Sequence, residues 1–365
     1  MGAPSTRELV SGFLKVGLTS FGGPLVAMSL IHQEAVERKR WVTPQWFAQT
    51  LGILQAVPGP SAFEMSLSIG IATRGRLGGL ACAAAYMLPG FFLMLALSAA
   101  YFHLGQMPAA ARTLAALGPA ALAVLGIVCV RLTRKLVVDR LDWALWAAAL
   151  AACLAGVPVG GVVVLGGAAS LSVRRPSAAG LALVPFVLLG AGPGSLERLP
   201  SLFFGMLKAG ALIVGGGYNI AAFVSDDFVA RRGWLSPEEF LAGFALAQFK
   251  PGPIILLSVF VGYRVAGALG AVVAAAGVFL PCVSTLLALG PGLERLRGGP
   301  RAGVFLSGMG VAATASVVAA AVEMLPAAVS APRAVVVFVV ALAALQKLEP
   351  GVVLAAAALA GLLVP

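Results

Sequence analysis

Two matching stretches decide the fold of this chain: Gln55-Ala56-Val57-Pro58-Gly59-Pro60 and Gln248-Phe249-Lys250-Pro251-Gly252-Pro253. Each interrupts an otherwise apolar run, at residues 46–72 and 240–262. Proline lacks an N–H group and restricts φ, and glycine adopts dihedral angles that other residues avoid. Pro-Gly-Pro therefore ends one helix and begins the next, so each half of the sequence is predicted to contain a broken helix.

The two breaks belong to a duplication. With a shift of 193 residues, positions 12–60 contain 15 identities to the second half without a gap. The identities include Trp41 with Trp234 and Gln55 with Gln248, which a bias toward Ala or Leu would not produce. After one deletion the likeness continues at a shift of 192 residues. The chain is therefore an internal repeat.

The composition places these helices in a lipid bilayer. Of the 365 residues, 60% are hydrophobic and 11% are charged, and the mean hydropathy is +0.99. Soluble globular proteins have about 25% charged residues. Several apolar runs approach the roughly 20 residues that a spanning helix needs. We therefore predict an all-α polytopic membrane protein, and interpret the net charge of +11 as basic cytoplasmic loops rather than nucleic-acid binding.

The loop charges predict that the two repeats are inverted. In the first half, residues 103–111 contain no Lys or Arg and residues 131–140 contain four. In the second half, residues 291–301 contain three and residues 326–333 contain one. Since Lys and Arg favour the cytoplasmic side, the swapped pattern places matching loops on opposite sides. The apolar run 178–192 has no partner in the second half and supplies the extra crossing.

From these boundaries we expect three parts. Residues 1–176 form the first repeat, residues 177–199 form an extra membrane segment and linker, and residues 200–365 form the second repeat. In this topology residues 32–45 are cytoplasmic and residues 225–237 lie outside.

Broken helices in inverted repeats are typical of transporters. The N-terminus of a half-helix carries unpaired N–H groups and a positive partial charge, so a buried one binds anions. The glycine clusters Gly22-Gly23-Pro24 and Gly215-Gly216-Gly217 either add such ends or allow close helix packing. We therefore predict an anion site near the bilayer midplane. Its predicted backbone residues are Gly22, Gly23, Pro58, Gly59, Pro60, Ser61, Gly215, Gly216, Pro251, Gly252 and Pro253.

Two matched pairs of side chains complete the predicted substrate site. Lys15 and Lys208 lie about six residues into their apolar runs, roughly 9 Å deep. They either attract the anion or extend back to the interface. Gln55 and Gln248 each precede a break, and their amides either hold substrate oxygens or satisfy carbonyl groups that proline leaves free.

Two unmatched charges, Glu64 and Lys250, lie beside the breaks. Ser61-Ala62-Phe63-Glu64 fits a capping box if the half-helix begins at Ser61. The alternative is an ion pair between Glu64 and Lys250, because an isolated charge at this depth is unfavourable and an inverted repeat brings the breaks together. Such a pair would gate the site or couple transport to protonation.

The sequence lacks the motifs of several other functions. No ATP-binding loop of the form GxxxxGK[ST] is present, which argues against an ATP-driven pump. The four cysteines form no CxxC pair, only two histidines occur, and no Ser/His/Asp arrangement is visible. We therefore predict neither an enzyme nor a cofactor or metal site.

The motifs resemble those of the chromate ion transporter family. The likeness covers nearly the whole chain, because each half carries its own version. The resemblance implies a two-repeat, multi-pass carrier of the inner membrane that exports chromate and confers chromate resistance, with sulfate as a related substrate. The matching motifs are Lys15-x-Gly17, Phe21-Gly22-Gly23-Pro24 and Gln55-x-x-Pro58-Gly59-Pro60, then Lys208-x-Gly210, Gly215-Gly216-Gly217-Tyr218 and Gln248-x-x-Pro251-Gly252-Pro253.

Around both breaks the sequence departs from the family pattern. Ser61-Ala62-Phe63-Glu64 stands where small polar and amide residues are usual, and Ile254-Ile255-Leu256-Leu257 where hydroxyl residues are usual. Lys250 replaces a small or neutral residue. Two alternatives therefore stay open: a carrier of another inorganic or organic anion on the same fold, and a passive anion channel. A homodimer is also open.

Overall fold

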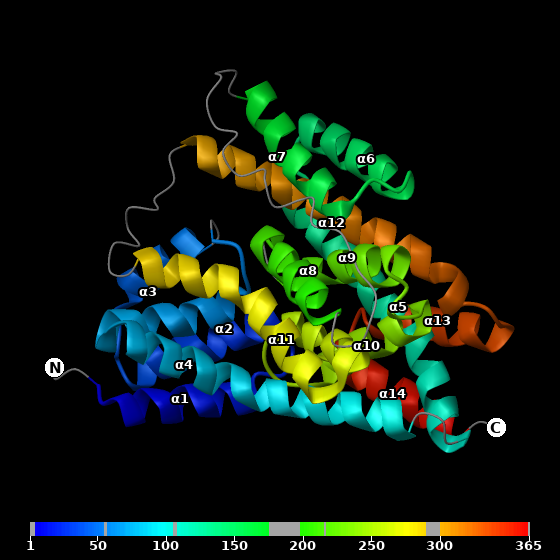
Figure 1. Ribbon diagram of the computed structural model, residues 1–365, viewed down its shortest axis with the longest axis horizontal. Coiled ribbons are helices and arrows are strands. Elements are labelled where there is room, and N and C mark those ends of the chain that lie inside the picture. Colours follow the sequence, from blue (N-terminus) through cyan, green and yellow to red (C-terminus); the bar gives the residue numbers. More distant parts are fainter. Residues whose placement is uncertain are drawn as a thin grey trace.

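The computed structural model of this chain, drawn in Figure 1, describes residues 4–54, 57–104, 108–174, 198–214, 217–289 and 300–363. These residues form helices and no strand. Of the predicted site residues, Gln55, Gly215 and Gly216 lie outside the described residues, as does the apolar run 178–192. The described part confirms the all-α fold.

The first half contains seven α-helices and one π-helix in its described part. In chain order they are α1 (Thr6–Thr19), α2 (Pro24–His32), the π-helix η1 (Gln33–Arg38), α3 (Pro44–Leu54), α4 (Ser61–Leu104), α5 (Pro108–Leu136), α6 (Arg140–Leu154) and α7 (Val159–Arg174).

The second half repeats this order, with two additional short 3₁₀ helices, η3 and η5, at the starts of matched segments. Its elements are α8 (Arg198–Leu212), η3 (Gly217–Asn219), α9 (Ile220–Val224), the π-helix η4 (Ser225–Arg231), α10 (Pro237–Phe249), η5 (Ile254–Leu256), α11 (Leu257–Leu289), α12 (Pro300–Ala328), α13 (Pro332–Ala344) and α14 (Pro350–Leu363).

Matching helices of the two halves keep an almost constant spacing along the chain. Helices α5 and α12 begin at residues 108 and 300 and end at 136 and 328, so both ends are 192 residues apart. Helices α6 and α13 begin at residues 140 and 332, again 192 residues apart. The duplication read from positions 12–60 therefore extends through the full set of helices.

Helices α4 and α11 both bend sharply at a matched glycine. Gly75 in α4 has φ +71° and Gly267 in α11 has φ +59°, a region that favours glycine. Beyond each bend the chain folds back, so that the helical segments before and after the bend touch. The contact requires two facing glycines, because a Cβ atom on either would collide with the carbonyl oxygen of the other. The facing pairs are Gly70 with Gly78 and Gly262 with Gly270.

Four described helical segments are long and apolar enough to cross a membrane: residues 61–104, 113–136, 254–288 and 303–328. A straight helix of 44 residues would extend about 66 Å, twice the roughly 30 Å of a bilayer core, so the bend in α4 is needed to fit it. Large apolar side chains such as Leu77, Phe92 and Val336 are exposed, as expected where helices face lipid. The chain is therefore a multi-pass membrane protein.

The long matched helices run in opposite directions in Figure 1. The limb of α4 that follows its bend runs toward the lower right, and the corresponding limb of α11 runs toward the upper left. The two helices also contact each other. The two breaks, at residues 58–60 and 251–253, lead directly into α4 and into η5 and α11, and they position the candidate site.

Candidate functional site

The two Pro-Gly-Pro breaks are held by reciprocal hydrogen bonds between the repeats. The N–H of Gly59 donates to the carbonyl oxygen of Ile213 at 3.0 Å, and the N–H of Gly252 donates to that of Ser20 at 3.2 Å. Ser20 and Ile213 follow the C-terminal ends of α1 and α8 and are themselves a matched pair. Each break therefore rests on a helix end of the opposite repeat, the pattern that a two-fold relation produces.

The central glycine of each break has a backbone conformation that favours glycine. Gly59 has φ +155° and Gly252 has φ +87°. A long helix of the opposite repeat covers each break. A Cβ atom on Gly59 would lie 2.8 Å from Cβ of Cys282 in α11, and one on Gly90 in α4 would lie 2.5 Å from the carbonyl oxygen of Pro251. Cys282 and Gly90 occupy matched positions, so this packing is also reciprocal.

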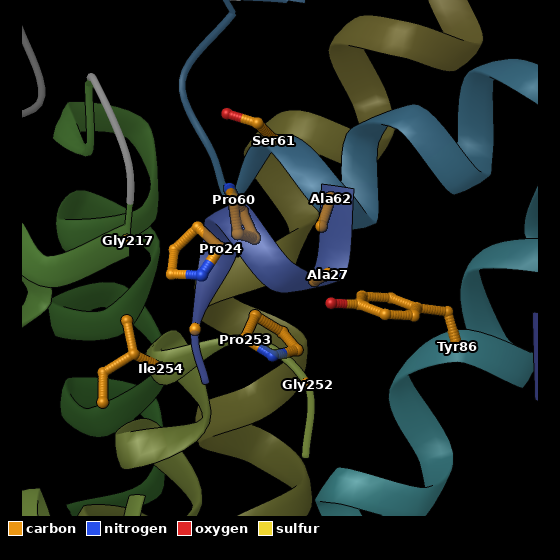
Figure 2. Close-up of a pocket in the computed structure, with 11 residues that line it drawn as sticks. Pro24, Ala27, Pro60, Ser61, Ala62, Tyr86, Gly217, Gly252, Pro253 and Ile254 are labelled. Carbon is orange, nitrogen blue, oxygen red and sulfur yellow. The ribbon is translucent and has the colours of Figure 1, made fainter. Parts of the chain in front are cut away.

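A small pocket lies between the two breaks (Figure 2). The centre of a water-sized sphere can move within about 10 Å³ of this pocket, so the pocket has room for roughly one water molecule. Both repeats contribute to it through their breaks and glycine clusters. The lining residues are Gly23, Pro24, Ala27, Pro60, Ser61, Ala62, Tyr86, Gly217, Gly252, Pro253 and Ile254.

Four helical segments begin at this pocket. Helix α2 begins at Pro24, α4 at Ser61, η3 at Gly217, and η5, which continues into α11, at Ile254. The first N–H groups of a helix have no partner within it and carry a positive partial charge. Pro24 follows the cap residue Gly23, with φ +85°, and proline is favoured at the first position of a helix. The pocket is therefore lined by helix N-termini from both repeats.

The structure brings only part of the predicted site to this pocket. Gly23, Pro60, Ser61, Gly252 and Pro253 line it. The remaining described backbone residues belong to the same breaks and cluster but are not among its lining residues: Gly22, Pro58, Gly59 and Pro251.

Gln248 also lies outside the pocket lining. Its buried Nε2 atom has no hydrogen-bond partner among the residues that the structure describes. The amide is therefore not satisfying a carbonyl group freed by proline within that part of the chain.

The two matched lysines do not reach the pocket, because each lies beside a matched carboxylate. Nζ of Lys15 is 3.7 Å from Oε2 of Glu34, and Nζ of Lys208 is 3.1 Å from Oδ2 of Asp227. The Lys15 side chain is 55% exposed and that of Lys208 is 20% exposed. Sequence analysis did not pair the lysines with these carboxylates, although Glu34 and Asp227 are 193 residues apart.

The cluster of the second repeat is the more buried one. Arg232 donates to Asp227 at 2.9 Å and stacks over the rings of Trp234 and Phe228. Asp227 lies outside the four membrane-crossing segments. Burial acts to raise the pKa of Asp227, but hydrogen bonds from Arg232 and the charges of Lys208 and Arg232 outweigh it and hold the pKa below its ordinary value.

The predicted ion pair between Glu64 and Lys250 is wrong. Lys250 is 2% exposed, and its Nζ atom donates to the carbonyl oxygen of Pro253 at 2.7 Å, so the side chain folds over its own break. Glu64 is 0% exposed, and neither carboxylate oxygen has a hydrogen-bond partner in the described part of the chain. Its Oε1 atom lies instead next to Gly59.

The alternative for Glu64, a capping box with Ser61, is not formed either. Helix α4 begins at Ser61 itself, one position earlier than a cap at Ser61 requires. The N–H of Glu64 donates to the carbonyl oxygen of Pro60 at 3.1 Å, as in an ordinary helical turn. Glu64 is thus a buried carboxylate in the first turn of α4, next to the residues that line the pocket.

Tyr86 is a pocket residue that sequence reasoning missed. It lies on the second limb of α4, and Figure 2 shows its hydroxyl directed into the pocket. The matched residue in the second repeat is Val278, so the repeat comparison carried no signal for it.

Comparison with known proteins agrees with the two-repeat organisation of the chain. The family model described as "Chromate transporter" matches residues 7–172 and 200–362, one match in each half. No solved structure matches significantly.

Three curated relatives cover most of the chain. A chromate transport protein of Pseudomonas aeruginosa is 35% identical, with 99% of this chain and 92% of the relative covered. A probable chromate transport protein of Synechococcus elongatus is 32% identical over 88% of this chain and 85% of the relative. A chromate transport protein of Cupriavidus metallidurans is 30% identical over 98% and 92%. By both the family match and these relatives, the chain belongs to the chromate transporter family.

Proposed function

We propose that the protein is a secondary transporter that exports chromate, a tetrahedral divalent oxyanion, across the inner membrane. The substrate binds near the bilayer midplane, in the pocket between two inverted repeats. The observation that carries this proposal is the convergence of helix N-termini from both repeats on one pocket. The names of the relatives support chromate as the substrate.

Helix N-termini suit an oxyanion for a physical reason. Backbone N–H groups donate to several oxygens at once, and their partial charges are fixed by the fold and need no reorganisation when the anion enters. The matched lysines are compensated by Glu34 and Asp227 and lie elsewhere. Lys250, buried behind the second break, is the basic group nearest in sequence to Gly252 and Pro253. Burial lowers its pKa to about 7, so a bound anion favours its charged form.

The inverted arrangement of the repeats has three supports. The Lys and Arg content of matching loops is swapped. The long limbs of α4 and α11 point in opposite directions in Figure 1. The hydrogen bonds of Gly59 and Gly252 are reciprocal. In such carriers, one repeat moves against the other around a fixed site. The small pocket corresponds to a closed form, which must widen to admit chromate.

The unmatched charges at the breaks are the proposed gating and coupling groups. An ionised Glu64 would face a bound divalent anion from behind the first break without a donor among the described residues, which is unfavourable in a membrane interior. Binding of the anion and of a proton on Glu64 therefore favour each other. Lys250 holds the second break closed through Pro253 and releases that carbonyl when it turns to the anion.

The test is a flux assay with purified protein in liposomes. Chromate is loaded on one side under imposed proton, potential or sulfate gradients. We expect net movement of chromate against its own gradient, with sulfate as a competitor. Gly23→Val should abolish it, because Gly23 has positive φ and lines the pocket. Gly52→Ala is the control, because a Cβ atom on Gly52 meets open space.

Each alternative predicts a different flux. Chromate that only equilibrates under every imposed gradient would indicate a passive channel. Concentrative movement of another inorganic or organic anion, without competition by chromate, would assign the same fold to that substrate.

A further inference from the structure

The hydroxyl group of Tyr86 is a buried polar group without a visible function in the closed pocket. The residue is 0% exposed, and its oxygen has no hydrogen-bond partner among the described residues. The hydroxyl of Ser20 is near it but not in hydrogen-bonding geometry. Leaving a buried hydroxyl unpaired destabilises a protein. A phenylalanine at this position would avoid that loss.

Packing holds the tyrosine in place. Its backbone lies against α1, where a Cβ atom on Gly17 would be 2.5 Å from the Tyr86 carbonyl oxygen. In Figure 2 the ring reaches from α4 toward Ala27, and its oxygen faces the space between that residue and Pro253. The small side chain of Ala27 thus leaves the hydroxyl open to the pocket. The close contact between Gly17 and Tyr86 keeps the backbone of α4 against α1.

Ser20 lies near this hydroxyl and supports the second break. The Ser20 hydroxyl accepts a hydrogen bond from the N–H of Gly252 at 3.1 Å, and Gly252 lines the pocket. Ser20 is itself buried. An anion in the pocket would therefore meet the Tyr86 hydroxyl on one side and the break that Ser20 supports on another.

We propose that Tyr86 is a substrate-binding residue whose hydroxyl donates a hydrogen bond to one oxygen of the bound oxyanion. The inference rests on the proposed function and adds a selectivity element to it. Helix N-termini attract any small anion, whereas a hydroxyl held in one place favours a tetrahedral oxyanion that has an oxygen to meet it. Because Val278 occupies the matched position, only the first repeat provides this donor.

The test compares Tyr86→Phe with the wild type. The variant keeps the ring and removes only the donor. Tyr101→Phe is the matched control, since Tyr101 lies on the same helix and packs against Phe102 and Phe260 outside the pocket. Chromate flux in liposomes gives KM and the maximal rate, and the melting temperature of detergent-purified protein is measured with chromate, sulfate, phosphate and chloride.

A hydrogen bond to a charged group supports an expected rise in KM of roughly tenfold or more for Tyr86→Phe. The maximal rate should change by less than about twofold, and the oxyanion-induced rise in melting temperature should shrink while any chloride effect is unchanged. Without ligand, the melting temperature should be equal to or above that of the wild type, because an unpaired hydroxyl has been removed. Tyr101→Phe should leave all these quantities unchanged.

Two results would overturn the role of Tyr86. One is an unchanged KM and unchanged oxyanion shifts in Tyr86→Phe. The other is a loss of unliganded stability that accounts for the change in KM. If wild-type protein does not transport chromate, the proposed function fails separately. The melting comparison with whichever tetrahedral oxyanion stabilises the wild type then decides on Tyr86, and no stabilisation by any of them would count against it.

Discussion

The two Pro-Gly-Pro breaks share a backbone but carry opposite side chains. Gly59 and Gly252 donate to matched partners in the opposite repeat. The first break is followed by the buried carboxylate of Glu64, and the second is preceded by the buried ammonium group of Lys250, with Ile254, Ile255 and Leu256 after it. The symmetric backbone therefore builds the pocket, whereas the side chains make its two sides unequal.

The largest expected effect concerns the relation between the repeats themselves. In a variant without native cysteines, Arg38→Cys and Arg231→Cys place matched, exposed positions on opposite sides of the membrane if the repeats are inverted. An impermeant maleimide added outside should label position 231 and not position 38, an all-or-none difference. Labelling of both from the same side would show that the repeats are parallel.

The second prediction concerns Lys250, the basic residue that distinguishes the second break from the first. Lys250→Met keeps an unbranched side chain but loses the buried cation, and we expect chromate flux to fall roughly 100-fold because electrostatic attraction is strong in a low-dielectric site. The flux assay in liposomes measures it. Lys347→Met is the control, since Lys347 is exposed. Equal fluxes for both variants would show that Lys250 does not act on the anion.

The third prediction compares the central glycines. Gly252→Ala meets open space and suffers only from its positive φ, whereas Gly59→Ala also collides with Oε1 of Glu64 and with Cβ of Cys282. We expect Gly59→Ala to be less stable by about 2 kcal/mol, the usual effect of overpacking. Melting of the detergent-purified protein checks this difference.

A second substitution sharpens that comparison. Cys282→Gly introduces the residue that the first repeat has at the matched position, Gly90, and should restore part of the stability that Gly59→Ala loses. If it restores nothing, the collision with Cys282 is not the cause.

The fourth prediction concerns Glu64, the acidic residue beside the first break. Glu64→Gln keeps the size of the side chain but cannot ionise. In the wild type, transport should fall as the pH rises and Glu64 loses its proton, because a carboxylate repels the anion. The variant should lose the part of this dependence that Glu64 causes, a change of about tenfold at the alkaline end. The part that remains reports Lys250, whose pKa burial lowers to about 7. Initial chromate flux measured across a pH series tests it, and an unchanged profile would exclude Glu64 from coupling.

The smallest effect distinguishes the two lysine clusters. Lys208 is mostly buried beside Asp227, whereas Lys15 is mostly exposed beside Glu34. We expect Lys208→Ala to destabilise the protein by about 1 kcal/mol and Lys15→Ala by less than about 0.5 kcal/mol, because exposed ion pairs contribute little. Chromate KM should change little in either variant. A large rise in KM for Lys15→Ala would return this lysine to the substrate site.

Much of the protein could be read from local features of the sequence. Low charge and long apolar runs identify a membrane protein, because such apolar helices are stable in lipid rather than in water. A duplicated Trp, Gln and Pro-Gly-Pro determine the repeat and the positions of the breaks, because proline and glycine act on their own backbone. Five of the predicted backbone residues line the pocket for this reason.

Only the tertiary structure decided which side chains meet. Glu64 and Lys250 are each close in sequence to a break, but the direction of a side chain depends on its place on the helix and on its neighbours. Lys250 finds the carbonyl of Pro253, and Glu64 turns toward Gly59. Tyr86 enters the pocket because α4 folds back along α1, a contact between segments about 70 residues apart that no local pattern encodes. Long-range packing, rather than proximity to a motif, selects the residues of this site.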